Sequence, residues 1–199
     1  MKKLLLATAL AAVLPGAANA ATIVSEDFEG GFGAFTATGQ VQVADGATYA
    51  PCCGTNPANT NSFVAFGGGQ VPSGTISTTF ATVAGSTYTL SFDYGALGMF
   101  SESLFVNIGD DSYVLSPFAN NDLASTFQSI SIAYTATGNL TTLSFSSDGR
   151  DNVDSIVDNV LVSGAVPEPA AWAMLIGGFG VVGGSLRRSA RRAAGVAHA

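Results

Sequence analysis

The stretch that decides the fold is Ser86–Tyr94, STYTLSFDY, near the middle of the chain. Every second residue in it is large and apolar, and the residues between are threonine, serine or aspartate. The apolar set is Tyr88, Leu90, Phe92 and Tyr94. A period of two is that of a β-strand with one face in the core and the other in water. The stretch therefore predicts a half-buried strand.

Short runs of the same kind continue on both sides of this stretch. In QSISIAYT the apolar positions are Ile130, Ile132 and Tyr134. The other runs are Thr22–Phe28, Gln40–Ala44, Ser62–Phe66, Gly74–Ala81, Ser103–Ile108, Ser112–Ser116, Leu140–Ser146 and Ser155–Ser163. Turn residues such as Gly109-Asp110-Asp111 separate them, and no sustained helical period occurs before residue 166. This pattern predicts an all-β domain, an antiparallel β-sandwich of the jelly-roll kind.

The two ends of the chain have a different composition from this body. Lys2 and Lys3 precede the apolar run Leu4–Leu14, and Ala18 and Ala20 form a small-x-small cleavage site. This arrangement is typical of a secretory signal peptide. We therefore expect residues 1–20 to be removed after Ala20 and the domain to be exported.

The C-terminal segment begins with Pro167, Glu168 and Pro169 and continues with the uncharged run Ala170–Leu186. Four arginines follow: Arg187, Arg188, Arg191 and Arg192. A helix of this run would be about 25 Å long, at the lower limit for crossing a bilayer core. Arginines mark the cytoplasmic end of such a segment. The sequence thus predicts a single C-terminal transmembrane helix with residues 193–199 as a cytoplasmic tail.

The proline-glutamate-proline motif, apolar run and basic end, in this order, resemble the PEP-CTERM sorting signal of Gram-negative bacteria. The resemblance covers residues 166–192 and leaves 21–165 as an exported β-sandwich domain. It implies an exosortase as partner, anchoring in the inner membrane before processing, and delivery to the cell surface or extracellular matrix. In this reading Pro167, Glu168 and Pro169 are recognised by the processing enzyme and have no catalytic role.

The charge of the exported part restricts its partners. Residues 21–169 contain all 14 acidic residues and one base, Arg150, which leaves a net charge of −13. Such a surface repels phosphates, so nucleic acid is excluded as a ligand. The only histidine, His198, lies beyond the predicted anchor, so an exported Ser-His-Asp or Cys-His site is excluded too. A carboxylate pair of the glycosidase type remains, without a distinguishing spacing. We expect no enzymatic activity.

Acidic residues near the first and last strands predict a structural calcium ion. Calcium requires six to eight oxygen ligands, and Glu29 and Asp158 are the candidates to bridge the terminal strands. In a regular strand Asp158 would share a face with Ile156, Val160 and Val162, so its carboxylate needs a partner. That partner is calcium, Arg150 or a backbone amide. DFEGGFGAF and VDNVLVSGAVPEP also resemble the first and last strands of carbohydrate-binding jelly rolls, several of which hold such a calcium.

Three functions fit these observations. The first is an exported, non-catalytic surface or matrix protein, sorted by an exosortase and associated with exopolysaccharide. The alternatives are a calcium-dependent carbohydrate-binding module and a secreted glycan-active enzyme. Sugar binding requires exposed aromatic rings. The candidates in or beside loops are Tyr49, Phe100, Tyr113 and Phe118, although aromatics at strand ends are more often part of a core.

Overall fold

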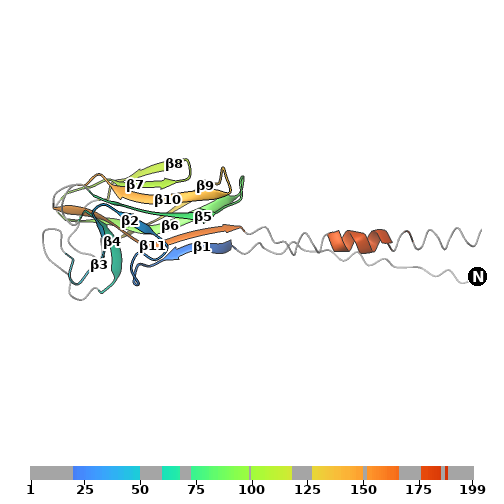
Figure 1. The fold of residues 1–199 in the computed structure, drawn as a ribbon, viewed down its shortest axis with the longest axis horizontal. Coiled ribbons are helices and arrows are strands. Elements are labelled where there is room, and N and C mark those ends of the chain that lie inside the picture. Colours follow the sequence, from blue (N-terminus) through green and yellow to red (C-terminus); the bar gives the residue numbers. More distant parts are fainter. Residues whose placement is uncertain are drawn as a thin grey trace, which may run out of the picture. The chain divides into compact units, whose positions relative to one another are not determined.

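The computed structural model describes residues 20–49, 60–67, 73–98, 100–117, 127–149, 152–165, 176–184 and 187. Residues Ala20–Ala165 form one compact unit. The strands of this unit build two antiparallel sheets (Figure 1). The predicted antiparallel β-sandwich is therefore confirmed at the level of fold class.

Sheet A contains six strands in the order β3, β4, β11, β6 and β9, with β1 also paired to β11. Its strands are β1 (Ala20–Glu26), β3 (Val41–Asp45), β4 (Ser62–Phe66), β6 (Thr87–Gly98), β9 (Gln128–Thr135) and β11 (Val153–Ala165). The central strand is β11. Its first half pairs with β4 and its second half with β1, while β6 follows it along almost its whole length.

Sheet B contains five strands in the order β2, β5, β10, β7 and β8. They are β2 (Thr36–Thr38), β5 (Thr75–Ala81), β7 (Leu104–Ile108), β8 (Asp111–Leu115) and β10 (Leu140–Ser147). All ten predicted runs are strands, and the predicted turn at Gly109 joins β7 to β8. The sequence missed β2, because three residues are too few to display a period of two.

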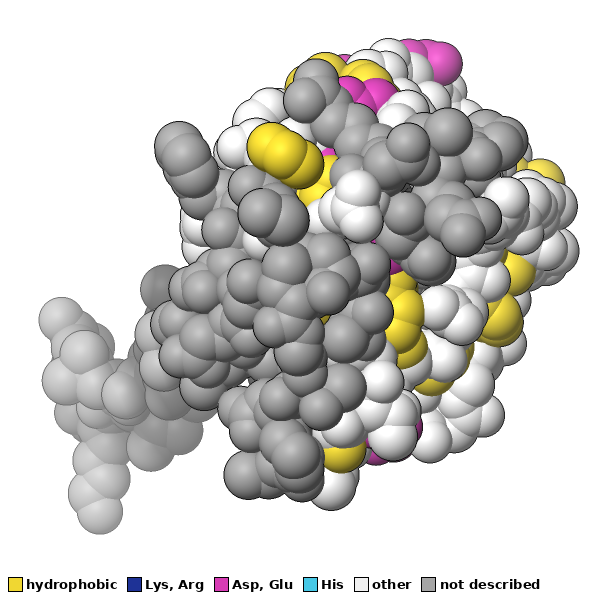
Figure 2. All heavy atoms as spheres, turned by 90° about the vertical axis from the view of Figure 1, so that its left-hand side faces the viewer, with side chains coloured by type: hydrophobic (Ala, Val, Ile, Leu, Met, Phe, Trp, Pro, Cys, Tyr) yellow, Lys and Arg dark blue, Asp and Glu magenta, His cyan; other side chains and the backbone are white. Residues whose placement is uncertain are grey.

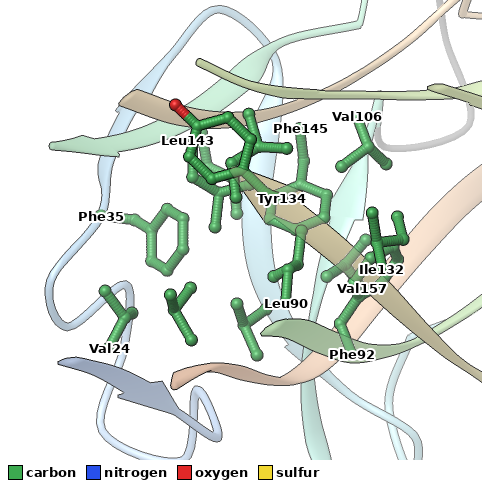
Figure 3. Close-up of a cluster of buried hydrophobic side chains, with 14 of the residues drawn as sticks. Val24, Phe35, Leu90, Phe92, Val106, Ile132, Tyr134, Leu143, Phe145 and Val157 are labelled. Atoms are coloured by element: carbon green, nitrogen blue, oxygen red, sulfur yellow. The ribbon is translucent and has the colours of Figure 1, made fainter. Parts of the chain in front are cut away.

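The main core contains the apolar side chains that alternate inward from both sheets, as Figure 3 shows. Tyr88, Leu90 and Phe92 of the deciding stretch are all buried there. Aromatic rings connect the layers: the Phe92 centroid lies 5.0 Å from that of Phe145, in an edge-on contact. Phe145 in turn lies 6.2 Å from Phe35. The predicted assignment of faces in β6 is thus confirmed.

A smaller apolar cluster lies on the opposite, outer face of sheet A. Its buried members are Phe63, Ala65, Leu97 and Ile156. Tyr49 and Phe127 pack against Phe63 with ring centroids 5.9 Å and 6.0 Å away. This end of the outer face is therefore covered by side chains from outside the sheet.

A β-bulge in β11 interrupts the inward-outward alternation that was predicted around Asp158. Asp158 pairs with Asp93, whereas the next paired residue, Leu161, is opposite Ser91. The extra residue is absorbed at Asn159, whose φ is 50°. Because the bulge changes the parity, Asp158 shares the outer face with Ile156, while Val160 and Val162 point into the main core. The expectation that all four share one face was wrong.

The C-terminal segment is described only at residues 176–184, which are helical, and at Arg187. Within the described residues, no helix has the length and apolar character needed to cross a membrane. The proline-glutamate-proline motif, Arg188, Arg191, Arg192 and Ala18 lie outside the described residues, and of Ala20 only the backbone, in β1, is described. The sorting signal therefore stays a prediction.

Candidate functional site

The outer face of sheet B carries an array of small polar side chains, called here the hydroxyl face. It consists of the residues that alternate with the buried core residues on each strand. These are Thr36 and Thr38; Thr75, Ser77, Thr79 and Ala81; Leu140, Thr142, Ser144 and Ser146; Phe105 and Asn107; and Ser112 and Val114. All of them are partly or fully exposed.

Strand register aligns these residues into two rows that cross all five strands. The polar row runs through Thr36, Ser77, Ser144, Asn107 and Ser112, each opposite the next on the neighbouring strand. The second row runs beside it through Thr38, Thr75, Ser146, Phe105 and Val114. With strands about 4.8 Å apart, each row is about 19 Å long.

Hydrogen bonds hold the polar row in place at the β10, β7 and β8 end. Ser112 Oγ donates to Asn107 Oδ1 over 2.7 Å. Asn107 Nδ2 donates to Ser144 Oγ over 3.4 Å. One row further along, the hydroxyls of Thr79 and Thr142 lie 3.0 Å apart. Each hydroxyl keeps further donor or acceptor capacity for a ligand.

Phe105 gives this polar array an apolar element. Its neighbours Leu104 and Val106 are fully buried, but Phe105 points to the solvent side and is partly exposed. The adjacent Val114 is 63% exposed. The arrangement therefore offers an aromatic ring next to a row of hydrogen-bonding groups. The sequence contained the signal, because Leu104, Val106 and Ile108 fill the inward positions of this strand and leave Phe105 outside.

The hydroxyl face is uncharged, although the domain is strongly acidic. None of its residues is Asp, Glu, Lys, Arg or His. The described part of Ala20–Ala165 also contains no basic residue, while acidic side chains occur in both sheets and in the turns. Figure 2 shows acidic and no basic side chains among the described atoms on one side of the molecule.

The carboxylates of the predicted metal ligands Glu29 and Asp158 are close enough to interact electrostatically, near the end of β1 and the start of β4. Asp158 is 2% exposed. It accepts hydrogen bonds from the Asn159 backbone amide at 2.7 Å and the Asn61 side-chain amide at 2.8 Å. Both carboxylate oxygens of Glu29 accept hydrogen bonds from Ser62. Among the three predicted partners of Asp158, a backbone amide is thus present.

Burial raises the pKa of Asp158 above its ordinary value of 3.8. The hydrogen bonds from Asn61 and Asn159 act in the opposite direction, while the carboxylates of Asp93 and Glu29 raise the pKa further. Within the described part of the chain, no three acidic, histidine or cysteine side chains come together in a way that could hold a metal ion. Calcium binding by Glu29 and Asp158 stays a prediction.

The predicted aromatic candidates are in different environments. Tyr49 packs on Phe63 and donates its hydroxyl to the Asp154 carboxylate, so it belongs to the outer cluster. Tyr113 is partly buried against the main core. Phe100 is 55% exposed, in the loop after β6. Phe118 lies outside the described residues.

Two buried carboxylates were not predicted from the sequence. Glu102 is 1% exposed and accepts a hydrogen bond from the backbone amide of Ser155, so a residue next to sheet B bonds to the central strand of sheet A. Asp154 is fully buried and accepts the hydroxyl of Tyr49. Both contacts join residues far apart in the sequence, and no local pattern indicates them.

Comparison with known proteins places this domain in a family. Residues 55–163, more than half of the chain, match the model of the family described as protein of unknown function, DUF642. The chain belongs to the DUF642 family. No curated protein matches it significantly.

Solved structures similar to this DUF642 domain include carbohydrate-binding modules. The CBM22-1 xylan-binding domain of Paenibacillus barcinonensis Xyn10C is 14% identical, with a TM-score of 0.51 covering 75% of this chain and 98% of that chain. TmCBM61, solved with β-1,4-galactotriose, is 15% identical, with a TM-score of 0.51 over 69% and 93%.

A third similar structure holds the CBM22-1 and GH10 modules of Clostridium thermocellum xylanase 10B, complexed with xylohexaose. It is 16% identical, with a TM-score of 0.50, and the match covers 73% of this chain but 29% of that larger one. At these identities the likeness establishes the fold. The DUF642 domain therefore shares a β-sandwich fold with carbohydrate-binding modules.

Proposed function

We propose that the domain of residues 21–165 is a non-catalytic carbohydrate-binding module and that it binds a polysaccharide on the hydroxyl face. The observation that carries this proposal is the position of Phe105, a partly exposed aromatic ring beside the hydrogen-bonded Ser112, Asn107 and Ser144. The apolar side of a sugar ring packs on an aromatic ring, and its hydroxyls exchange hydrogen bonds with amide and hydroxyl groups.

The fold supports the same proposal. The similar structures include a xylan-binding domain and a module solved with β-1,4-galactotriose. Successive strands of this chain alternate between the two sheets at several points, which supports a jelly-roll description.

Affinity electrophoresis of residues 21–165 in gels containing xylan, β-1,4-galactan or the exopolysaccharide of the producing cell tests the proposal. At least one gel should retard the domain, and Phe105→Ala should abolish the retardation. The matched control is Leu161→Ala, which truncates a partly exposed apolar residue on the outer face of sheet A. Retardation that survives Phe105→Ala, or turnover of the glycan by the domain, would overturn the proposal.

We further propose that the protein is sorted to the cell surface through residues 166–192. The described residues 176–184 support it, because they are helical and include Ile176, Phe179 and Val181 without any charged side chain. Such an uncharged apolar stretch favours a membrane environment. An exported sugar-binding domain delivered to the cell surface would meet the extracellular polysaccharide there.

Mutants in an exosortase-containing host separate sorting from simple anchoring. Glu168→Ala and Pro169→Ala should insert normally but accumulate as a full-length membrane-bound form. Replacement of the four arginines should instead weaken retention or orientation. If Glu168→Ala matured to the same size and surface yield as the wild type, the sorting proposal would fail and a plain anchor would remain.

A further inference from the structure

We infer that the ligand of the hydroxyl face is an uncharged glycan several sugars long, and that its chain crosses the strands of sheet B along the two rows. This inference rests on the proposed function and specifies the ligand class and its direction. It follows from the register of the strands and from the distribution of charge.

The direction follows from the continuity of the rows. The polar row presents a hydroxyl or amide on every strand from Thr36 on β2 to Ser112 on β8. Along a single strand the outer face presents fewer polar side chains: three in succession on β5 and on β10, but only Asn107 beside Phe105 on β7 and only Ser112 beside Val114 on β8. A polymer that lies across the strands therefore meets a hydrogen-bonding group about every 4.8 Å.

Phe105 determines where the glycan would lie relative to the two rows. It stands on β7 next to Asn107 of the polar row and directly opposite Ser146 and Val114 in the second row. A sugar ring stacked on Phe105 would have its hydroxyls over Asn107. The next rings would then lie over Ser144 and Ser77, in the direction in which the rows continue from β7 over three more strands, β10, β5 and β2.

The charge distribution determines the ligand class. Binding of a polyuronate requires cationic side chains or a bridging cation, and the hydroxyl face has neither a basic nor an acidic side chain. The rest of the domain is strongly acidic, which repels a polyanion over distances of about one Debye length, about 8 Å at physiological salt. A neutral glycan avoids this repulsion, and its binding should depend little on salt.

A length series and a blocking variant test the direction. For β-1,4-xylose and β-1,4-galactose oligomers, affinity measured by calorimetry should rise from the disaccharide to at least the tetrasaccharide. Ser77→Glu places a larger, charged side chain on the polar row, two strands from Phe105. It should weaken hexasaccharide binding about tenfold, the equivalent of one or two hydrogen bonds, and should weaken hexasaccharide binding more than disaccharide binding.

The matched control is Ser131→Glu, the same substitution on the exposed outer face of sheet A, which should leave both affinities unchanged. Polygalacturonate should not retard the domain at low salt. Affinity that stops rising at the disaccharide, or preferential binding of polygalacturonate, would overturn this inference. The proposed function would still be supported if a gel retards the wild type and does not retard Phe105→Ala. If the domain binds neither these glycans nor the exopolysaccharide of the producing cell, both the inference and the proposed function fail.

Discussion

Replacing Asp158 by asparagine should stabilise the domain more at neutral pH than at acid pH. The native state raises the pKa of this carboxyl above 3.8, first through burial and then through Asp93 and Glu29. The folded protein therefore binds the proton more tightly than the unfolded chain does. The contribution of Asp158 to the free energy of unfolding is most favourable below pH 3.8 and decreases as the pH rises through the folded-state pKa.

Two opposing terms determine how much Asp158→Asn changes the free energy of unfolding. Each unit by which the native state raises the pKa corresponds to about 1.4 kcal/mol lost at neutral pH, and the asparagine variant does not lose it. Asparagine can still accept from the Asn159 backbone amide through Oδ1, but its Nδ2 takes the place of the oxygen that accepted from Asn61 Nδ2 and can only donate, so that hydrogen bond is lost. That change costs about 0.5–1.5 kcal/mol at any pH, and less if water solvates Asn61, which is exposed.

Urea unfolding of the wild type and of Asp158→Asn in chelator, from acid to neutral pH, separates the two terms. At acid pH, the difference in the free energy of unfolding between variant and wild type gives the cost of the changed hydrogen bond. The increase of this difference with pH gives the electrostatic contribution of the ionised carboxylate. Asp110→Asn, on the exposed turn between β7 and β8, controls for the loss of one negative charge. A difference that is independent of pH, or that decreases as the pH rises, would refute the reasoning.

Three further predictions concern stability. Calcium at millimolar concentration should raise the melting temperature in a scanning calorimeter, and Asp158→Ala should remove the shift, because a ligand that binds only the folded state stabilises it; no shift relative to chelator would disprove the calcium site. Glu102→Ala should lower the free energy of urea unfolding by about 1–3 kcal/mol, because it orphans the Ser155 amide, whereas Glu102→Gln should lower it less; equal losses would contradict this role. Gly109→Ala should cost at least about 1–2 kcal/mol, since φ is 58° and the new Cβ would lie 2.2 Å from Tyr134 Oη; an unchanged melting curve would argue against this geometry.

Much of the fold was predictable because the period of two is a local property. Tyr88, Leu90 and Phe92 show their buried face within a single strand, without knowledge of their partners. The bulge at Asn159 was not predictable in this way. Asparagine tolerates a positive φ, but the sequence does not show that the extra residue lies where β11 passes from β4 to β1 while staying paired with β6.

The site was less predictable, because strand pairing between distant segments creates it. Asn107, Ser144 and Ser77 become neighbours through the order β7, β10, β5, which no spacing in the sequence encodes. That Glu29 and Asp158 lie close together was expected from the acidic residues near the first and last strands, whereas calcium binding by them stays a prediction. The carboxylate of Glu102 was not, because its burial depends on a contact with the other sheet.

Composition alone could not identify the proposed binding face either, because both sheets expose serine and threonine. Sheet A has its own cross-strand pair of threonine hydroxyls, Thr87 with Thr135, as sheet B has Thr79 with Thr142. The two faces differ in two respects. The outer face of sheet A carries Asp93 and the outer apolar cluster, whereas that of sheet B is uncharged and exposes an aromatic ring. Serine and threonine are therefore the common solvent-facing residues of both sheets, and the partly exposed Phe105 beside the uncharged polar row is the feature on which the proposed binding face depends.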